Sequence, residues 1–225
     1  MTRVAITTDR FDSVASAYAL RGLEPVPLPC LRVEPAGDDA LTYAREAAAD
    51  ADLLLVTSPR TVSLLWPEQE MPEVEVAAVG ESTAAAVAGS GGRVIAAGRS
   101  GLMGLIETVA DRLKQARVVF PHADGSDLAA SQRLRQLTGH VEEYVVYRTV
   151  PMAPAMTTVE AISFASPSAV QGWLMTRDLQ DVVVGVIGGT TGAAVARVRT
   201  PDAVAARPSH KALAVALADY LDKTA

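Results

Sequence analysis

Short apolar runs alternate with longer amphipathic segments along the whole chain. Two of these runs, 52–57 (DLLLVT) and 182–187 (VVVGVI), are apolar at nearly every position, which is typical of strands buried on both faces of a parallel sheet. Strands that alternate with helices predict an α/β fold with parallel sheets. The predicted strands are residues 3–7, 52–57, 74–79, 94–97, 117–121, 161–165, 182–187 and 203–206.

A polar turn follows each predicted strand and opens a helix. The first helix is expected to run to about Arg21 with Asp12 or Ser13 as its N-cap. The second is expected to span 38–50, with Asp38 or Asp39 as its cap. Later helices are predicted to end near residues 66, 88, 115, 137, 176 and 198, and a C-terminal helix completes the chain.

The chain contains an internal repeat. VTSPRTVSLLW (56–66) aligns with FASPSAVQGWL (164–174), and AAVGESTAAAV (77–87) aligns with GVIGGTTGAAV (185–195). Ser58 and Gly80 lie 22 residues apart in the first copy, and Ser166 and Gly188 lie 22 residues apart in the second. Segment 4–26 likewise resembles 118–145. The repeat predicts two similar α/β lobes, one discontinuous (1–30 with 151–225) and one formed by 36–143.

Two extended segments, 24–35 and 143–151, are predicted to connect the lobes. Residues 144–151 (YVVYRTVP) have the β-branched and aromatic character of a strand that ends at Pro151. Three prolines confine 24–33 to a sheet edge or an extended linker, and we expect the two segments to pair. Because ligand pockets tend to form between domains, Tyr147 and Arg148 are expected at a cleft, with the Tyr147 hydroxyl facing the surface.

Composition narrows the classes of function. The 225 residues carry a net charge of −6, which argues against general nucleic-acid binding because that requires a basic surface. A single cysteine, Cys30, excludes an intramolecular disulfide, and the three histidines show no metal-ligand spacing. No apolar run approaches membrane-spanning length, and the N-terminus lacks the apolar core of a signal peptide. We therefore expect a cytoplasmic protein.

Hydroxyl-rich turns at the strand ends are the candidate chemistry. In parallel sheets, ligands bind beyond the carboxyl ends of the strands, where helix N-termini attract anions. The alternative reading is that each Ser or Thr only caps its helix. His122 and His210 are expected to be solvated turn residues. Neither a phosphate loop nor a dinucleotide fingerprint is present, so the pattern predicts a cleft for a small polyanion. The turns are 58–60, 80–83, 166–168, 188–191 and 209–211.

Five motifs in this order and spacing resemble the uroporphyrinogen-III synthase family, from Val4 to the C-terminal helix. They are Thr-Ser-Pro-Arg (57–60), Val-Gly-x-x-Thr-Ala (79–84), Val-Tyr-Arg-Thr (146–149), Ser-Pro-Ser (166–168) and Ile-Gly-x-Thr-Thr (187–191). The resemblance implies two α/β lobes joined by a two-stranded β connector. It also implies an enzyme that cyclises linear hydroxymethylbilane to uroporphyrinogen III while inverting ring D. It includes no metal or organic cofactor.

The resemblance also implies roles for individual residues. The family's Tyr falls on Tyr147, which would act as the general acid that assists loss of water. The other matching residues would hold the propionate and acetate side chains of hydroxymethylbilane. They are Ser58, Arg60, Thr83, Arg148, Ser166, Thr190, Thr191 and Ser209. A monomer is expected, with at most transient contact with hydroxymethylbilane synthase and no nucleic-acid or membrane partner.

The chain departs from the family pattern at two places. Thr8 stands where the family usually has Arg after the first strand, and His122-Ala123 replaces a frequent Arg-Gly. Both changes remove or move positive charge that would face a substrate with eight carboxylates. They favour an alternative function, a non-catalytic tetrapyrrole- or polyanion-binding protein of the same fold. A nucleotide- or sugar-binding protein is a third reading, which the absent fingerprints and secretion signal disfavour.

Overall fold

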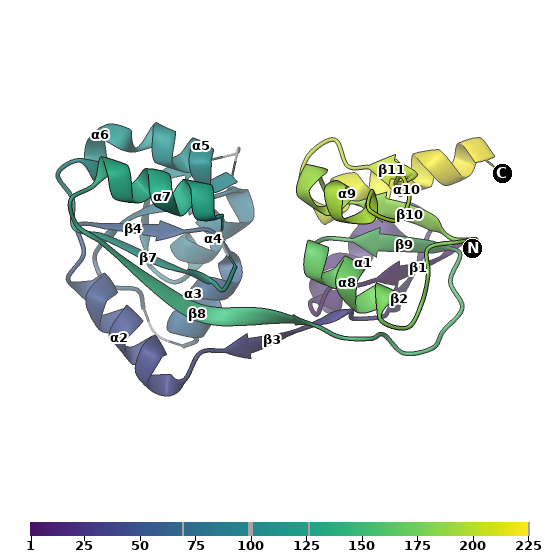
Figure 1. The fold of residues 1–225 in the computed structure, drawn as a ribbon, viewed down its shortest axis with the longest axis horizontal. Helices are drawn as coiled ribbons and strands as arrows, with labels where there is room; N and C mark the ends of the chain where they lie inside the picture. Colours follow the sequence, from purple (N-terminus) through teal and green to yellow (C-terminus); the bar gives the residue numbers. More distant parts are fainter. Residues whose placement is uncertain (69, 99–100, 126, 225) are drawn as a thin grey trace. The chain divides into compact units, whose positions relative to one another are not determined.

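The computed structural model describes residues 1–68, 70–98, 101–125 and 127–224. The chain divides into two compact units (Figure 1): unit 1 is Met1–Val33 with Thr149–Ala225, and unit 2 is Glu34–Arg148. The chain leaves unit 1 within strand β3 (Leu31–Pro35) and returns within strand β8 (Val141–Pro151). The sequence also predicts that these parts are domains that fold independently within the expected boundaries, and this stays a prediction.

Unit 1 contains a five-stranded sheet in the order β11-β10-β9-β1-β2. Every adjacent pair in it is parallel, with Val4 opposite Ala161 and Val184 opposite Ile162. Parallel neighbours need a crossover connection, so a helix follows most of these strands. The strands are β1 (Arg3–Ile6), β2 (Glu24–Pro27), β9 (Ala161–Phe164), β10 (Val183–Val186) and β11 (Ala203–Val204).

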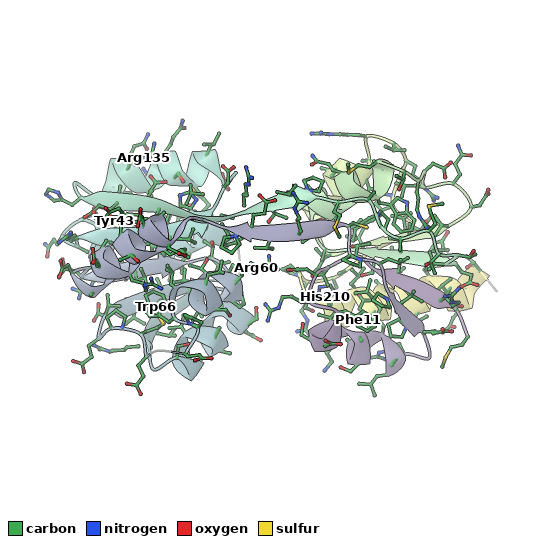
Figure 2. All side chains as sticks on the ribbon, turned by 90° about the horizontal axis from the view of Figure 1, so that it is seen from below. Phe11, Tyr43, Arg60, Trp66, Arg135 and His210 are labelled. Carbon is green, nitrogen blue, oxygen red and sulfur yellow. The ribbon has the colours of Figure 1, made fainter. Side chains whose placement is uncertain are left out.

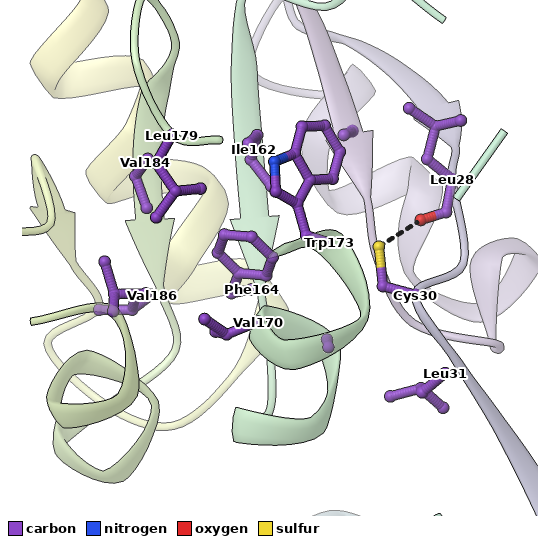
Figure 3. Close-up of a cluster of buried hydrophobic side chains, with 13 residues drawn as sticks. Leu28, Cys30, Leu31, Ile162, Phe164, Val170, Trp173, Leu179, Val184 and Val186 are labelled. Carbon is purple, nitrogen blue, oxygen red and sulfur yellow. Dashed lines mark hydrogen bonds between the residues drawn. The ribbon is translucent and has the colours of Figure 1, made fainter. Parts of the chain in front are cut away.

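Helices α8 (Pro167–Leu174) and α9 (Gly189–Val195) pack on one face of this sheet. Their core is centred on Phe164 and Trp173, whose rings meet edge to face with centroids 6.2 Å apart (Figure 3). The Cys30 thiol lies in the same cluster and donates to the Leu28 carbonyl at 3.3 Å. Burial raises the pKa of this thiol to about 12, so it behaves as a small apolar side chain.

Helices α1 (Phe11–Ala19) and α10 (His210–Thr224) cover the other face. Val4 and Ile6 alternate with Ala5 along β1, so they point to this side, where they join Tyr18, Leu213 and the rest of a second core cluster. The two faces are therefore both apolar. This explains why β1 and β9 are completely buried over most of their length.

Unit 2 contains a six-stranded sheet in the order β3-β8-β7-β4-β5-β6. The central strand β4 is buried at all four positions, as the apolar run at 52–57 predicts. The pairs β4–β5, β4–β7, β5–β6 and β7–β8 are parallel. The remaining bounds are β4 (Leu53–Val56), β5 (Glu75–Val79), β6 (Arg93–Gly98) and β7 (Val118–Ala123).

Helices cover this sheet as well (Figure 1). α5 (Gly101–Thr108), α6 (Ala110–Leu113) and α7 (Leu128–Leu137) bury Leu53, Leu55 and Phe120 beneath them. On the other side, α3 (Pro59–Leu65) packs against α2 (Asp38–Ala49) and α4 (Glu81–Gly89). Side chains from alternate positions of β4 thus enter two separate apolar layers.

The sheet orders confirm the internal repeat. Reading outward from β4, unit 2 has β5 and β6 on one side and β7 and β8 on the other. Reading outward from β9, unit 1 has β10 and β11 on one side and β1 and β2 on the other. The aligned segments occupy equivalent strands, so the chain builds two similar parallel-sheet α/β units, one of them discontinuous.

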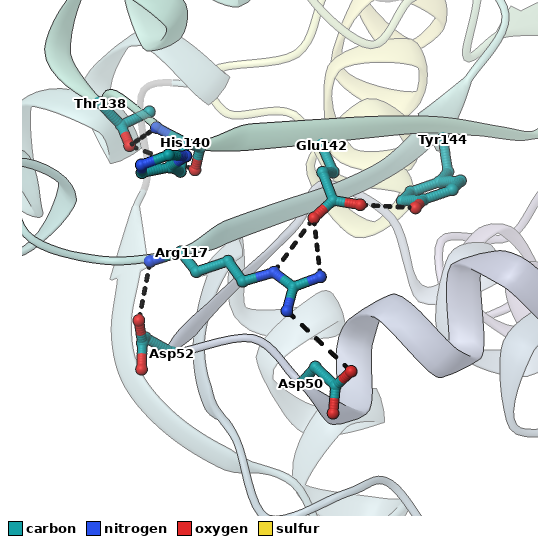
Figure 4. A network of polar contacts seen from close by, with 7 residues as sticks. All are labelled: Asp50, Asp52, Arg117, Thr138, His140, Glu142 and Tyr144. Carbon is teal, nitrogen blue, oxygen red and sulfur yellow. Dashed lines mark hydrogen bonds and ion pairs between the residues drawn. The ribbon is translucent and has the colours of Figure 1, made fainter.

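A polar network closes the amino end of the sheet in unit 2 (Figure 4). Arg117 donates to Glu142 at 2.9 Å and lies 4.0 Å from Asp50. The Tyr144 hydroxyl donates to the other oxygen of Glu142 at 2.9 Å. These hydrogen bonds, that from Tyr144 first, lower the pKa of Glu142. Because the groups are partly solvated, each contact stabilises the fold only modestly.

Several local predictions are wrong in detail. No side chain caps α1 or α2, whose N-cap residues are Arg10 and Gly37. The predicted helix at 101–115 is two helices, α5 and α6. The prolines of 24–33 leave β2 at the edge of one sheet and β3 at the edge of the other. Within this segment only β3 lies beside β8, and its role as half of a connector stays a prediction.

The glycine at 172 is a steric requirement of unit 1. Its position in α8 faces the backbone of Cys30 and Met152, and a Cβ would lie 2.6 Å from the Met152 carbonyl oxygen and closer still to that of Cys30. Backbone cannot move aside as a flexible side chain can. The same two residues are joined by a hydrogen bond from the Met152 N–H to the Cys30 carbonyl, at 2.9 Å.

We therefore expect Gly172→Ala to lower the free energy of unfolding by about 1–3 kcal/mol or more, because overpacking displaces the backbone. Gly89→Ala is the matched control, since Gly89 is also helical and a Cβ there meets nothing within 4 Å. That variant should gain about 0.5–1 kcal/mol from helix propensity. Urea denaturation of both variants measures the difference, and equal stability would contradict the steric argument.

Candidate functional site

The carboxyl ends of the parallel strands form one edge of the sheet in each unit, and the predicted site residues follow these ends. In unit 2, Ser58 and Arg60 follow β4 and Thr83 follows β5. In unit 1, Ser166 follows β9, Thr190 and Thr191 follow β10, and Ser209 precedes α10.

Ser58 is the N-cap of α3. Its Oγ accepts a hydrogen bond from the Arg60 backbone N–H at 3.2 Å, and Pro59 occupies the first helical position. A capping serine accepts through a lone pair and keeps its own hydrogen free to donate. Ser58 therefore does cap its helix, as the alternative reading expects, and its hydroxyl hydrogen is still available to a ligand.

Tyr147 lies on β8 beside Arg60. The guanidinium carbon of Arg60 is 5.6 Å from the centroid of the Tyr147 ring, within the range of a cation–π contact, and Figure 2 labels Arg60. Tyr147 is 6% exposed, so the expectation of a surface-facing phenol is wrong: the ring is enclosed.

Pairing with β7 skips one residue of β8 between Val145 and Tyr147, and such a bulge redirects the side chains beyond it.

The other two predicted residues of unit 2 lie in contrasting surroundings. Thr83, in the first turn of α4, is 1% exposed. The preceding Gly80 has a φ of 80°, a conformation that favours glycine. Arg148 is exposed and forms an ion pair with Glu34, with Nε 2.6 Å from the carboxylate. An incoming carboxylate would have to compete with Glu34 for this guanidinium.

In unit 1, two predicted serines act as caps. Ser166 is the N-cap of α8 and its Oγ accepts from the Ala169 N–H at 3.2 Å. Ser209 accepts from the Ala212 N–H at the same distance at the start of α10. Thr190 is exposed in the first turn of α9, whereas Thr191 is 3% exposed.

A buried group that the sequence did not reveal lies at the same edge. The hydroxyl of Tyr18, on α1, is hydrogen bonded to Ser163 Oγ and to His210 Nδ1, the latter at 3.0 Å. Burial raises the pKa of Tyr18, which keeps the phenol protonated. Burial, with a smaller contribution from Arg10, lowers the pKa of His210. His210 is therefore a partly buried, hydrogen-bonded residue of α10 and differs in this from the solvated turn residue that the sequence predicted.

The second histidine prediction is also wrong. His122 belongs to β7, is 8% exposed and donates from Nδ1 to the Ala123 carbonyl at 2.8 Å. Its Nε2 lies 3.7 Å from a Glu143 oxygen. At the other departure from the family pattern, the Thr8 hydroxyl accepts from the Arg10 N–H at 3.3 Å and shapes the turn after β1.

The opposite edge of unit 1 has a hollow of about 540 Å³. It is lined by the loops that precede β9 and β10, including Thr157, Arg177 and Asp181. None of the predicted site residues lies there. In the part of the chain that the structure describes, no group of three or more His, Cys, Asp or Glu side chains could hold a metal ion.

Comparison with known proteins decides the family. The family model described as "Uroporphyrinogen-III synthase HemD" matches residues 12–214, which is most of the chain. The chain belongs to the uroporphyrinogen-III synthase family. Its activity is accordingly that of a cyclising lyase of tetrapyrrole and heme biosynthesis, which converts hydroxymethylbilane to uroporphyrinogen III with inversion of ring D.

Solved structures of uroporphyrinogen-III synthases have the same fold. The enzyme from Helicobacter pylori matches with a TM-score of 0.67 at 17% identity, covering 98% of this chain and 99% of that one. A mutant enzyme from Thermus thermophilus matches with a TM-score of 0.63 at 17% identity, covering 99% and 100%. No curated protein sequence matches significantly. Among the described helices of this uroporphyrinogen-III synthase family member, none is long and apolar enough to cross a membrane.

The lowered pKa of His210 predicts how stability depends on pH. The unfolded histidine takes up a proton near pH 6.5, whereas the folded one does so only at lower pH. Protons therefore favour the unfolded state, and the free energy of unfolding should fall as pH is lowered from about 7 through the folded pKa. Urea denaturation at a series of pH values should show a shallower fall for His210→Gln than for wild type. His140→Gln, at an exposed histidine, should keep the wild-type slope, and an unchanged slope in His210→Gln would contradict the assignment.

Proposed function

We propose that Tyr147 is the general acid of the cyclisation and that hydroxyls and backbone N–H groups at the helix starts hold the substrate's carboxylates. In this reaction the hydroxyl leaves ring A as water and an azafulvene electrophile forms. The substituted carbon of ring D attacks it, and the resulting spiro intermediate fragments and recloses. Unassisted closure occurs without inversion, so the protein has to hold the linear chain in the less favoured geometry.

The single observation that carries the role of Tyr147 is its contact with Arg60. A phenol that protonates the departing hydroxyl becomes a phenolate, and a guanidinium 5.6 Å from the ring favours that negative charge by Coulomb attraction. Enclosure of the ring strengthens the attraction because bulk water screens it less. The proton released when the last ring regains its aromaticity restores the phenol, so the proton balance closes.

Carboxylate binding is supported by the free hydrogens of the capping serines. Ser58, Ser166 and Ser209 each accept one backbone hydrogen bond and can donate their hydroxyl hydrogen to a propionate or acetate. Thr190 is exposed and can donate likewise. Thr83 and Thr191 are buried, so their contribution would come from backbone N–H groups. Arg60 and Arg148 supply positive charge.

We also propose that the protein acts in the cytoplasm as a monomer and receives hydroxymethylbilane through transient contact with hydroxymethylbilane synthase. The chemistry supports the transient contact, because hydroxymethylbilane released into water closes without inversion. Direct transfer shortens the time during which that side reaction competes.

The test is a coupled assay that generates hydroxymethylbilane in situ and separates the oxidised I and III isomers. Wild type should yield mostly isomer III, and isomer I alone would instead favour a non-catalytic binding protein. In Tyr147→Phe, kcat should fall about 100-fold or more, because general acid catalysis contributes roughly 10²–10⁴. Tyr144→Phe, on the same strand but bonded to Glu142, is the control and should turn over normally. A wild-type rate in Tyr147→Phe would remove it from the mechanism.

Substitution at Ser166 separates capping from substrate binding. Ser166→Asp retains a cap acceptor, so stability should hold, but the added carboxylate repels the substrate and should raise KM. Ser166→Ala should lose about 1 kcal/mol of stability with the cap. Ser16→Asp adds the same charge at an exposed position of α1 and should leave KM unchanged. An unaltered KM in Ser166→Asp would show that this hydroxyl serves the helix alone.

A further inference from the structure

The hydrogen-bonded chain Ser163–Tyr18–His210 lies within unit 1 and takes no part in the proposed mechanism. Ser163 and Tyr18 are both completely buried. The Tyr18 hydroxyl bonds to both partners, to Ser163 Oγ and to His210 Nδ1. His210 is only partly buried and is the first residue of α10. The hydrogen-bonded chain thus leads from two completely buried side chains to the partly buried His210, which Figure 2 labels.

The number of hydroxyl hydrogens decides which groups donate and which accept in this chain of hydrogen bonds. Tyr18 has one hydroxyl hydrogen and two neighbours. If it donates to His210 Nδ1, Ser163 donates to Tyr18 and both buried hydrogens are used. If Nδ1 carries the proton instead, Tyr18 must donate to Ser163. The buried hydrogen of Ser163 would then lack an acceptor, because Tyr18 is the partner that the described residues offer to Ser163 Oγ. An unsatisfied buried donor costs about 1–3 kcal/mol, so the first arrangement is favoured.

This arrangement fixes the tautomer of His210. With Nδ1 accepting, the proton of the neutral ring is on Nε2. Tyr18 from α1 is hydrogen bonded to the imidazole, and Ser163 from β9 is bonded in turn to Tyr18. Arg10, from the turn before α1, acts on the ring electrostatically. The positive charge of Arg10 disfavours a second proton on the ring, and burial has the same effect. His210 is therefore a neutral donor through Nε2.

His210 is at the start of α10, at the edge of unit 1 where the residues proposed to bind carboxylates lie. Nδ1 points inward to a buried phenol, and the two ring nitrogens point away from each other across the ring. Ser209, the neighbouring residue, has its hydroxyl at the start of α10. Ser166 follows the strand that contains Ser163. A donor at Nε2 would add to the hydrogen bonds that these serines can offer to a carboxylate.

We propose that His210 binds a substrate carboxylate through Nε2–H, and that Tyr18 and Ser163 are positioning residues that hold its ring in the required tautomer. This inference rests on the function proposed above, since it assigns a further contact to the same polycarboxylate substrate. A neutral donor suits a partly buried position because it binds an anion without placing an unpaired charge there when the site is empty. An arriving carboxylate favours protonation of the ring, so binding should raise the pKa of His210.

The first test reads the tautomer in the free protein and needs no turnover. ¹⁵N NMR of the imidazoles, assigned with His210→Gln and His140→Gln, should show neutral His210 with its proton on Nε2. Tyr18→Phe should shift the population toward the Nδ1–H form. Addition of uroporphyrinogen III under anaerobic conditions should raise the pKa of His210 and leave the resonances of the exposed His140 unchanged. The proposal would be overturned if the neutral His210 ring of the wild-type protein has its proton on Nδ1, or if the pKa of His210 does not change when the ligand is added.

The second test separates binding from catalysis. In the coupled assay, His210→Ala should raise KM about tenfold, the effect of losing one hydrogen bond to a charged group, with kcat largely retained. His210→Gln should recover part of the loss because its amide can donate from a similar position. Tyr18→Phe should raise KM while denaturation shows a folded protein, and His140→Gln should match wild type.

The two tests fail in different ways. If wild type forms no isomer III, the proposed function is wrong while the tautomer measurement still reports on the hydrogen-bonded chain. If wild type forms isomer III and the His210 variants keep its KM, the contact proposed for His210 is wrong while the function stands.

Discussion

Each unit depends on the constraint that parallel strands impose on chain direction. Neighbouring parallel strands cannot be joined by a tight turn, so the chain must cross the sheet and return through a helix. All strands of such a sheet end at the same edge, and the helices begin there. The hydroxyls of Ser58 and Ser166 reach this edge because each follows the central strand of its sheet. The two apolar faces, the capping residues and the candidate chemistry all follow from that directionality.

Capping and the proposed ligand binding use different parts of the same hydroxyl. At Ser166 and Ser209 a lone pair accepts the backbone N–H, and the hydroxyl hydrogen is left to a ligand. The cap also fixes the side-chain rotamer, so a donor that would otherwise rotate freely is already oriented. Orientation before binding lowers the entropy that an anion has to overcome. In the proposed arrangement the Tyr18 phenol orients the His210 imidazole in the same way, from the interior of unit 1.

The sequence predicted the α/β class, the repeat and the order of motifs because these depend on local patterns. The apolar run of β4 and the paired Ser-Pro turns are legible without tertiary information. The surroundings of His210 were not legible, since they depend on side chains distant in the sequence: Tyr18 lies 145 residues from Ser163 and 192 from His210. The enclosure of Tyr147 was missed for a related reason, because the bulge between β7 and β8 is a property of strand pairing.

The discontinuity of unit 1 has a consequence for synthesis on the ribosome. Its strands β1 and β2 emerge first, yet their neighbours β9, β10 and β11 are translated only after the whole of unit 2. Unit 2 is continuous in sequence, so all of its strands are available as soon as β8 has emerged. The apolar β1 and the α1 helix must meanwhile wait without their partners, for more than a hundred residues of elongation. Until β9 emerges, the nascent chain therefore presents an apolar strand with an unpaired edge, which is the kind of surface that chaperones protect from aggregation.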